Sequence, residues 1–465
     1  MTDEERGFLD MLADPPMSCR PGMFWLLNGR LTPERIRDQI QQMHERGCGA
    51  FLMQPMGESF RLGDFIQGID PPYLSDGYFE MIRYAVQVAQ ELGMCAWLYD
   101  EGGWPSGTAQ GRVIEGHPEL RAQVLRPGEG GRRVARASVG GRRLHFSVHE
   151  LERPDHLNPE SARRFIELTH ERYAEHVGEF FGGTIPGIFT DETAVPGRVG
   201  GTEIPWTEGM MEKFERAAGY ELEPWLPVLF SDEALGLVLD EHFDPADIAA
   251  VRCELCELWT DLFEEAYWRQ ISDWCAAHDL IHTGHVGGED QLASHAASFG
   301  HFFKTAGALQ APGVDAIWRQ LFPGADNFCF PLLASSAVGQ RADRNLPGGG
   351  QWDGLAITES FAVYGLGLTP EQMRWLADYQ AMCGINYLTA MALYYETSGG
   401  RFVGAMSHLG DGNPLWDYFD SVADHVATMS AAVRFSEPVV TVAVYWPAEA
   451  AWLGGEACEA AWTSL

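Results

Sequence analysis

The chain has 465 residues, 46% of them hydrophobic, and a formal net charge of −34. This length can bury a deep core as one large domain with insertions or as two ordinary domains. The acidic excess repels polyanions, which argues against nucleic acid and anionic membranes as partners. No run approaches the roughly 18 apolar residues of a membrane span, and the first residues lack the pattern of a secretory signal. The nine cysteines are scattered along the chain, as is usual for proteins of a reducing compartment. Together with the missing signal pattern, they predict a cytoplasmic protein. The sequence leaves the oligomeric state open.

Short apolar runs alternate with helical patterns through the first half of the chain. We expect strands at residues 23–27, 49–53, 94–99 and 187–190. Thr32 and Asn158 each precede a proline, the order of an N-cap and a first helical residue, so helices should begin there. Glycines 47 and 93 end two of the helical patterns. The predicted order is therefore strand, helix, strand, repeated.

The same alternation continues through the second half of the chain. We expect one long helix over residues 247–275 and strands at 280–286, 314–318, 355–358 and 385–390. Thr369 and Gln372 have the spacing of a capping box, and a final helix should span 415–433. Eight apolar runs, each followed by a helix-like segment, predict an α/β fold of the (β/α)8 TIM-barrel type. The absence of a Gly-x-Gly-x-x-Gly after the first strand argues against a dinucleotide fold.

The domain boundaries follow from these patterns. Residues 1–20 form a lead-in, and 21–434 form the barrel. An insertion rich in Gly and Arg at about 113–157 interrupts the barrel, and alternation at 144–148 predicts a small β-hairpin there. Residues 435–465 are expected to begin a further unit that the chain does not complete, with a strand at 439–445.

Acidic residues follow several of the predicted strands. Asp191 and Glu192 end one strand, and Glu359 ends another. In a barrel the carboxyl ends of the strands meet at one mouth, where α/β proteins place their chemistry. Cleaving a glycosidic bond needs two carboxyl groups, one to protonate the leaving oxygen and one to attack the sugar or activate water. Glu192 and Glu359 are the expected catalytic pair; the alternative is that they cap helices or form structural ion pairs.

Neighbouring residues are candidates for binding a sugar. Because side chains alternate along a strand, Asp191 should point away from Glu192 and contact a substrate hydroxyl or form a structural hydrogen bond. In the glycine-rich stretch 100–107, Trp104 can stack on a sugar face, while Asp100 or Glu101 can accept hydrogen bonds from hydroxyls. The alternative for this stretch is a tight turn with a packed tryptophan.

Further candidates follow other strands. His285 and Glu289 are expected to bind sugar hydroxyls, and Asn28 and Glu396 are further candidates for contacts with substrate. A metal site built on His285, Glu289 and Asp290 is the alternative there, and its oxygen-rich donors would suit calcium.

Four motifs in this order resemble the α-L-rhamnosidase-like glycoside hydrolases. They are Arg20-Pro21-Gly22-Met23-Phe24-Trp25-Leu26-Leu27-Asn28-Gly29, Tyr99-Asp100-Glu101-Gly102-Gly103-Trp104-Pro105-Ser106-Gly107, Ile188-Phe189-Thr190-Asp191-Glu192 and Gly384-Ile385-Asn386. The similarity runs from about Arg20 to about Pro447.

The resemblance implies a TIM-barrel glycosidase acting on a carbohydrate, with Glu192 as the acid and Glu359 as its partner. It also implies that calcium can lie near the site and that Glu289, activating water, is an alternative partner. Members of the family are usually longer, with β-sandwich domains after the barrel, and many are secreted. A sugar-binding barrel without catalysis and a metal-dependent hydrolase remain the alternative functions.

Overall fold

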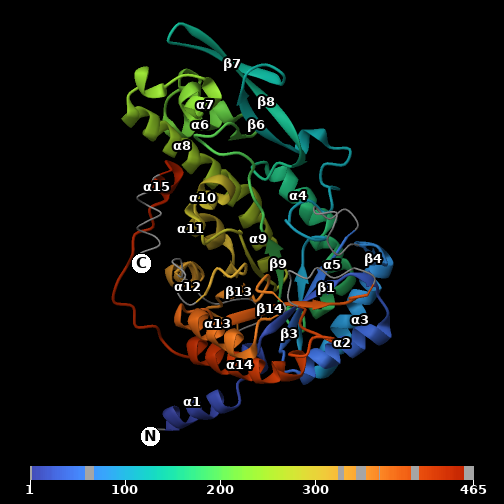
Figure 1. Cartoon of the computed structure of the whole chain (residues 1–465). Helices are drawn as coiled ribbons and strands as arrows, with labels where there is room; N and C mark the ends of the chain where they lie inside the picture. The colour runs from blue at the N-terminus through green and yellow to red at the C-terminus, as the bar shows by residue number, and fades with distance from the viewer. Residues whose placement is uncertain are drawn as a thin grey trace.

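Eight parallel strands close into a barrel in the order β1-β14-β13-β12-β11-β9-β5-β3. The computed structural model describes residues 3–57, 68–322, 329–341, 352–365, 367–398 and 408–454. The barrel strands are β1 (Gly22–Leu27), β3 (Ala50–Pro55), β5 (Cys95–Tyr99), β9 (Gly187–Asp191), β11 (Ile281–His285), β12 (Ala311–Ala316), β13 (Ile357–Ser360) and β14 (Tyr387–Tyr394). The predicted (β/α)8 barrel is thus confirmed (Figure 1).

Each barrel strand is buried on both faces, because its side chains alternate between two cores. In β1, Phe24 and Leu26 belong to the core inside the barrel. Met23 and Trp25 belong to the core between the strands and the surrounding helices. Such strands read as continuous apolar runs, which is the pattern that predicted them.

Helices cover the outside of the barrel. They include α2 (Pro33–Glu45), α3 (Asp76–Leu92), α4 (Pro159–Leu168), α5 (His170–Val177), α8 (Pro245–Phe263), α9 (Arg269–Ala277), α12 (Pro331–Gln340), α13 (Pro370–Met382) and α14 (Phe419–Arg434). Their expected start signals are present: Thr32 Oγ1 accepts a hydrogen bond from the Arg35 amide, and Thr369 and Gln372 form a capping box. An N-terminal helix, α1 (Asp3–Ala13), packs against α14. In the described part of the chain, no helix is both long enough and apolar enough to cross a membrane.

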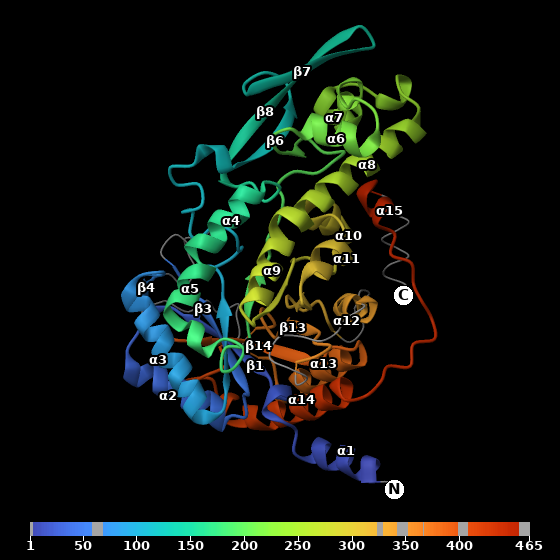
Figure 2. The ribbon, with the colours of Figure 1, turned by 180° about the vertical axis from the view of Figure 1, so that it is seen from behind.

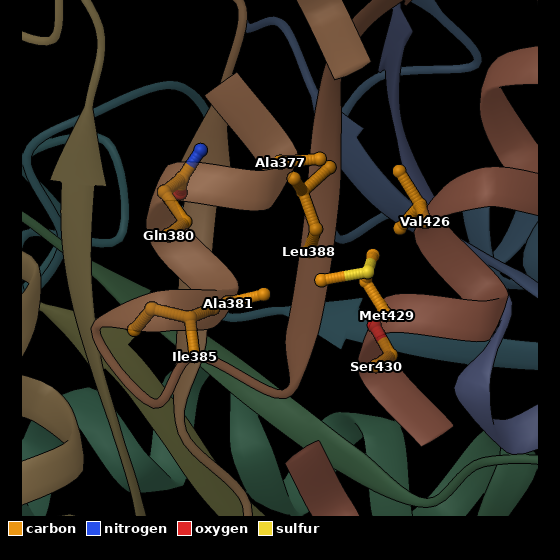
Figure 3. A pocket seen from close by; sticks show the side chains of 8 residues that line it. All are labelled: Ala377, Gln380, Ala381, Ile385, Leu388, Val426, Met429 and Ser430. Atoms are coloured by element: carbon orange, nitrogen blue, oxygen red, sulfur yellow. The ribbon is translucent and has the colours of Figure 1, made fainter. Parts of the chain in front are cut away.

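A small void lies where α13 and α14 pack against β14 (Figure 3). Its volume is about 10 Å³, and Leu388 and Met429 are among its lining residues. A space of this size holds at most one water molecule, so it is a feature of packing and offers no room for a ligand.

Two insertions form a lobe beside the barrel, at the end of the molecule opposite α1 (Figures 1 and 2). The first contributes β6 (Arg121–Pro127), β7 (Arg132–Val139) and β8 (Arg142–Pro154), and includes the predicted hairpin. The second, between β9 and β11, adds β10 (Ile204–Trp206) to the same sheet in the order β10-β6-β8-β7. It continues with α6 (Met210–Ala218), the 3-10 helix η4 (Glu223–Leu229), α7 (Asp232–Leu235) and α8.

Three predicted strands begin two or three residues away from where they were expected. The strand expected at 314–318 is β12, which begins at Ala311 and includes Pro312 and Gly313, expected to precede the strand. It ends before Trp318 because that residue has a φ of 54°, which a strand cannot continue through. The strands expected at 355–358 and 385–390 lie two residues later as β13 and β14, where pairing with neighbours sets their ends.

Two other expectations are wrong. The helix predicted over 247–275 is interrupted between α8 and α9 by a π-helical turn, η6 (Glu264–Trp268), which periodicity alone does not reveal. The strand predicted at 439–445 is an extended segment without strand partners in the described residues, and Val439 is 91% exposed. Alternating valines favour a strand, but a strand forms only where a neighbour completes its hydrogen bonds. The boundaries at residues 20 and 434 stay predictions.

His156 makes the folded state sensitive to acid. Its ring lies 4.8 Å from that of Tyr267 and against Gly107, and burial lowers its pKa from 6.5 to about 3. Below pH 6.5 the unfolded chain therefore binds more protons than the folded chain, so stability is lost as the pH falls. From pH 7 to pH 5 we expect this residue alone to remove about 2 kcal/mol from the free energy of unfolding.

Urea unfolding at the two pH values measures this loss. The variant His156→Leu should lose less stability between pH 7 and pH 5 than the wild type does. The matched control is His242→Leu at an exposed histidine of the lobe. An equal loss in His156→Leu and in the wild type would contradict the assignment.

Candidate active site

Acidic and aromatic side chains gather inside the barrel at the carboxyl ends of its strands. Phe189 lies in the inner core, so Asp191, two residues later on β9, also faces inward. Ile357 also lies in the inner core, so Glu359, two residues later on β13, faces inward as well. Register then pairs Asp315 of β12 with Glu359. The barrel therefore brings together carboxyl groups from strands far apart in the sequence.

His285, the last residue of β11, lies between two of these carboxyl groups. Its Nε2 is 3.3 Å from Asp191 Oδ1 and 3.3 Å from Glu359 Oε2, and its Nδ1 is 3.9 Å from Glu289 Oε1. Burial by itself lowers the pKa of His285, but Asp191, Asp315 and the other carboxylates raise it well above the ordinary value. The raised pKa favours the protonated ring, whose positive charge offsets part of the negative charge of these carboxylates.

Asp191 is fixed by the neighbouring strand and loop. Tyr99 Oη donates a hydrogen bond of 2.6 Å to its Oδ2. Its backbone exchanges two hydrogen bonds with Ser106, which lies in the glycine-rich stretch after β5. The hydrogen bonds from Tyr99 and with Ser106 therefore hold Asp191 in place inside the barrel.

Glu192 leaves the strand in an unusual backbone conformation. Its φ of 47° is rare for a residue with a side chain, and such strain is concentrated at functional sites. The side chain lies against Gly287, where an added Cβ would be 2.9 Å from Glu192 Cγ. Burial, followed by the charge of Asp191, raises the pKa of Glu192 to about 7. This carboxyl group can therefore hold a proton at neutral pH and release it.

Asp315 is a site residue that the sequence prediction missed. It is buried, and within the described ranges its Oδ1 has no hydrogen-bond partner. Burial and the charge of Glu359 raise its pKa well above the ordinary value. A carboxylate inside an apolar run was the available signal. Because the strand was expected to end at Trp318, Asp315 was placed in its interior, whereas it lies next to the end of β12.

Two other polar atoms in this group, one of them on His285 itself, also lack hydrogen-bond partners among the residues that the structure describes. Val286 and Gly287 donate backbone hydrogen bonds of 3.0 Å to Glu289 Oε1, but Glu289 Oε2 is buried without a partner. The same is true of His285 Nδ1. Buried polar groups are nearly always paired, so unpaired ones beside Asp315 offer hydrogen bonds to a ligand.

The acids of the glycine-rich stretch have other positions. Asp100 follows the inward-facing Tyr99 and so faces outward, where Ser106 Oγ donates to it at 2.6 Å and Thr190 Oγ1 also bonds it. Glu101 is fully buried under its own loop. Its two oxygens accept hydrogen bonds from the backbone amides of Gly102, Thr108, Ala109 and Gln110. These contacts give both carboxyl groups a part in shaping the loop.

Replacing Glu101 tests this assignment. An amide has only one acceptor oxygen, so Glu101→Gln would place its NH₂ group against buried backbone donors. We expect the free energy of unfolding, measured with urea, to fall by about 3 kcal/mol or more. The control is Glu115→Gln, an exposed residue in the same insertion. Similar stabilities of the two variants would contradict the loop assignment.

The other predicted residues lie around the mouth. Trp104 is half-buried and packs against the inner core. Asn28 Oδ1 and Nδ2 bond the backbone of Glu396 at 3.0 and 2.8 Å, which links the ends of β1 and β14. The Glu396 carboxylate accepts the Ser398 amide at 2.8 Å, and this bond lowers its pKa.

In the part of the chain that the structure describes, one group of donor atoms is close enough to share a metal ion. Asp191, His285 and Glu359 each offer an atom, and these atoms lie within 4.8 Å of one another. This set differs from the predicted His285, Glu289 and Asp290. One imidazole and two carboxylates suit zinc or manganese better than calcium, which prefers oxygen donors alone.

Two solved structures of glycosidases share the fold of this barrel. A rhamnosidase from Novosphingobium sp. PP1Y aligns with a TM-score of 0.64 and 12% identity, over 92% of this chain and 60% of that one. A β-galactosidase from Halorubrum lacusprofundi aligns with a TM-score of 0.51 and 14% identity, over 88% of this chain and 57% of that one. The chain thus spans about three fifths of these proteins, and at such identities the likeness concerns the fold. No family model and no curated protein matches the chain.

Proposed function

We propose that this chain hydrolyses O-glycosidic bonds, with Glu192 as proton donor and Glu359 as its carboxylate partner. The observation that carries the proposal is the convergence of buried carboxyl groups in unlike environments at one barrel mouth. Burial raises the pKa of Glu192 to about 7 and also raises the pKa of Glu359, but the hydrogen bond between His285 and Glu359 favours the charged form of Glu359. A cation bonded to one of two neighbouring acids favours the roles of base for that acid and proton donor for the other.

The reaction uses these differences. Glu192 would give its proton to the glycosidic oxygen as the bond to the sugar breaks. Glu359, held by His285, would attack the sugar or activate a water molecule, and Glu289 is the alternative partner. Asp315 and Glu289 would accept hydrogen bonds from sugar hydroxyls through their unpaired oxygens. Such an acidic site favours neutral sugars, because a uronic acid would be repelled. Rhamnose is one neutral sugar that the sequence resemblance suggests.

Hydrolysis of a panel of 4-nitrophenyl glycosides tests the proposal. We expect turnover on at least one neutral sugar and its loss in Glu359→Gln. The anomer formed first, followed by proton NMR, tells whether Glu359 attacks the sugar or activates water. Calorimetric binding of sugars without turnover on any substrate would favour a non-catalytic barrel and overturn the proposal.

A metal-dependent hydrolase is the second candidate, favoured by the close donor atoms of Asp191, His285 and Glu359. Two-carboxylate hydrolysis requires no metal, so we expect turnover to survive exhaustive dialysis against EDTA. Loss of turnover, with recovery on adding zinc or manganese but not magnesium, would favour the metal-dependent mechanism. Unfolding curves before and after dialysis separate a catalytic effect from a structural one.

A further inference from the structure

A second cavity lies in the part of the lobe that the chain forms between β9 and β11. It is separate from the barrel mouth. Its volume is about 360 Å³, and it is lined by Tyr220, Trp225, Asp247, Ala250, Val251 and Glu254. Tyr220 follows α6, Trp225 belongs to η4, and the other four lie on α8. Both ribbon views show α6 and α8 in the lobe (Figures 1 and 2). None of these residues belongs to the proposed catalytic group.

Aromatic rings form one wall of this cavity. The ring centroids of Tyr220 and Trp225 are 6.4 Å apart with their planes at 75°, and the ring centroid of Phe243 lies 6.1 Å from that of Trp225. Tyr220 Oη donates a hydrogen bond to Glu254, which fixes the tyrosine ring. Tyr220 and Trp225 are only half-buried, so they present apolar surface to a ligand. Aromatic faces of this kind suit the apolar faces of sugars.

Two carboxylates border the cavity on α8. Asp247 and Glu254 are exposed and seven residues apart, so they lie on one face of the helix about 10 Å apart along its axis. In the described ranges neither forms an ion pair with an arginine or lysine. Carboxylates accept hydrogen bonds from hydroxyl groups.

The spacing of the carboxylates decides between two classes of ligand. A single ammonium group would need both carboxylates to converge on it, and two helical turns separate them. An extended ligand with hydroxyl groups along its length can reach both while an apolar face lies on the aromatic wall. Small side chains at Ala250 and Val251 leave room for its rings. The geometry therefore favours a chain of sugars over a small cation.

We propose that this cavity is a second carbohydrate-binding site, which takes a neutral oligosaccharide without cleaving it. The site goes beyond the proposed hydrolysis, since it uses no residue of the barrel mouth. It would hold one part of a chain of sugars on the lobe, independently of reaction at the mouth.

Calorimetric titration of the full chain with neutral di- to tetrasaccharides tests the proposal. Glu192→Gln serves as the background, so that hydrolysis does not consume the ligand. Adding Trp225→Ala should weaken binding at one class of sites by about tenfold or more, because the aromatic wall is lost. Trp225→Phe should restore most of the affinity, which a general structural defect would not allow. Asp247→Asn with Glu254→Gln should also weaken binding.

The controls separate this site from the barrel mouth. Trp225→Ala in the wild-type background should leave turnover of a small aryl glycoside unchanged, and Glu215→Gln, an exposed residue of α6, should leave binding unchanged. Absence of saccharide binding, or equal binding with and without Trp225→Ala, would overturn the proposal. Binding of spermidine or choline that depends on Trp225, with no saccharide bound, would also overturn it. Failure of the proposed hydrolysis would appear as absent turnover with this binding intact.

Discussion

Glu192→Gln should lower kcat by about 10²- to 10⁴-fold, the usual contribution of a general acid. The glutamine keeps the shape of the side chain but has no proton to give to the leaving oxygen. The loss should be largest for substrates with poor leaving groups, and smaller for 4-nitrophenyl glycosides, whose leaving group departs with little help. Steady-state kinetics on both kinds of substrate measure the difference. The matched control is Glu80→Gln, an exposed glutamate on α3.

The pH dependence gives an independent readout of the same residue. Because the pKa of Glu192 is raised to about 7, its acid form is lost as the pH rises above that value. In the wild type kcat/KM should therefore fall about tenfold per pH unit in the alkaline range. Glu192→Gln should lack this decline. A variant that keeps wild-type rates and the same decline would contradict the assignment of Glu192 as the acid.

His285→Gln should lower the free energy of unfolding by about 3–5 kcal/mol at pH 7, the usual cost of removing one partner from a buried ion pair. The substitution removes the positive charge that Asp191 and Glu359 both face at 3.3 Å. Urea denaturation of the variant and of the wild type measures the loss. His242→Gln, at an exposed histidine, is the control.

The stability of this variant should depend on pH in a defined direction. Burial raises the folded-state pKa of Glu359 and Asp315, and removing the imidazolium raises it further. Groups with raised pKa values favour the folded state at low pH and lose that contribution as the pH rises. The deficit of His285→Gln relative to the wild type should therefore shrink from pH 7 to pH 5. A deficit equal at both pH values would show that the charge of His285 is not its main contribution.

The fold was predictable because its signals are local. Strands buried on both faces are short apolar runs, and Thr32 and Thr369 begin helices through bonds to residues three positions away. The predicted strand ends at Thr190, Val286 and Thr358 lie within two residues of the real ones, which was close enough to identify the acids of the mouth. Where neighbouring strands set the bounds, as in β12, the prediction was off by two or three residues.

The orientation of side chains at the site was harder to predict than the bounds of the strands. In a strand, a shift of one residue changes the face on which a side chain lies. Asp100 and Glu101 were expected to contact a sugar, and the structure has them bonded to Thr190 and to the loop amides. Asp315 was missed because its strand was expected to extend beyond it. A sequence pattern locates an acidic residue more securely than it orients the carboxyl group.

By itself, the sequence determined an acidic (β/α)8 barrel with Asp191, Glu192, His285 and Glu359 at the ends of its strands. These features depend on periodicity and composition, which are properties of neighbouring residues. Only the tertiary structure decided that His285 lies between Asp191 and Glu359, that Glu192 turns from the strand at a φ of 47°, and that Asp315 joins them. Those facts depend on barrel closure, which brings together residues as distant in the sequence as Asp191 and Glu359 and buries them from water.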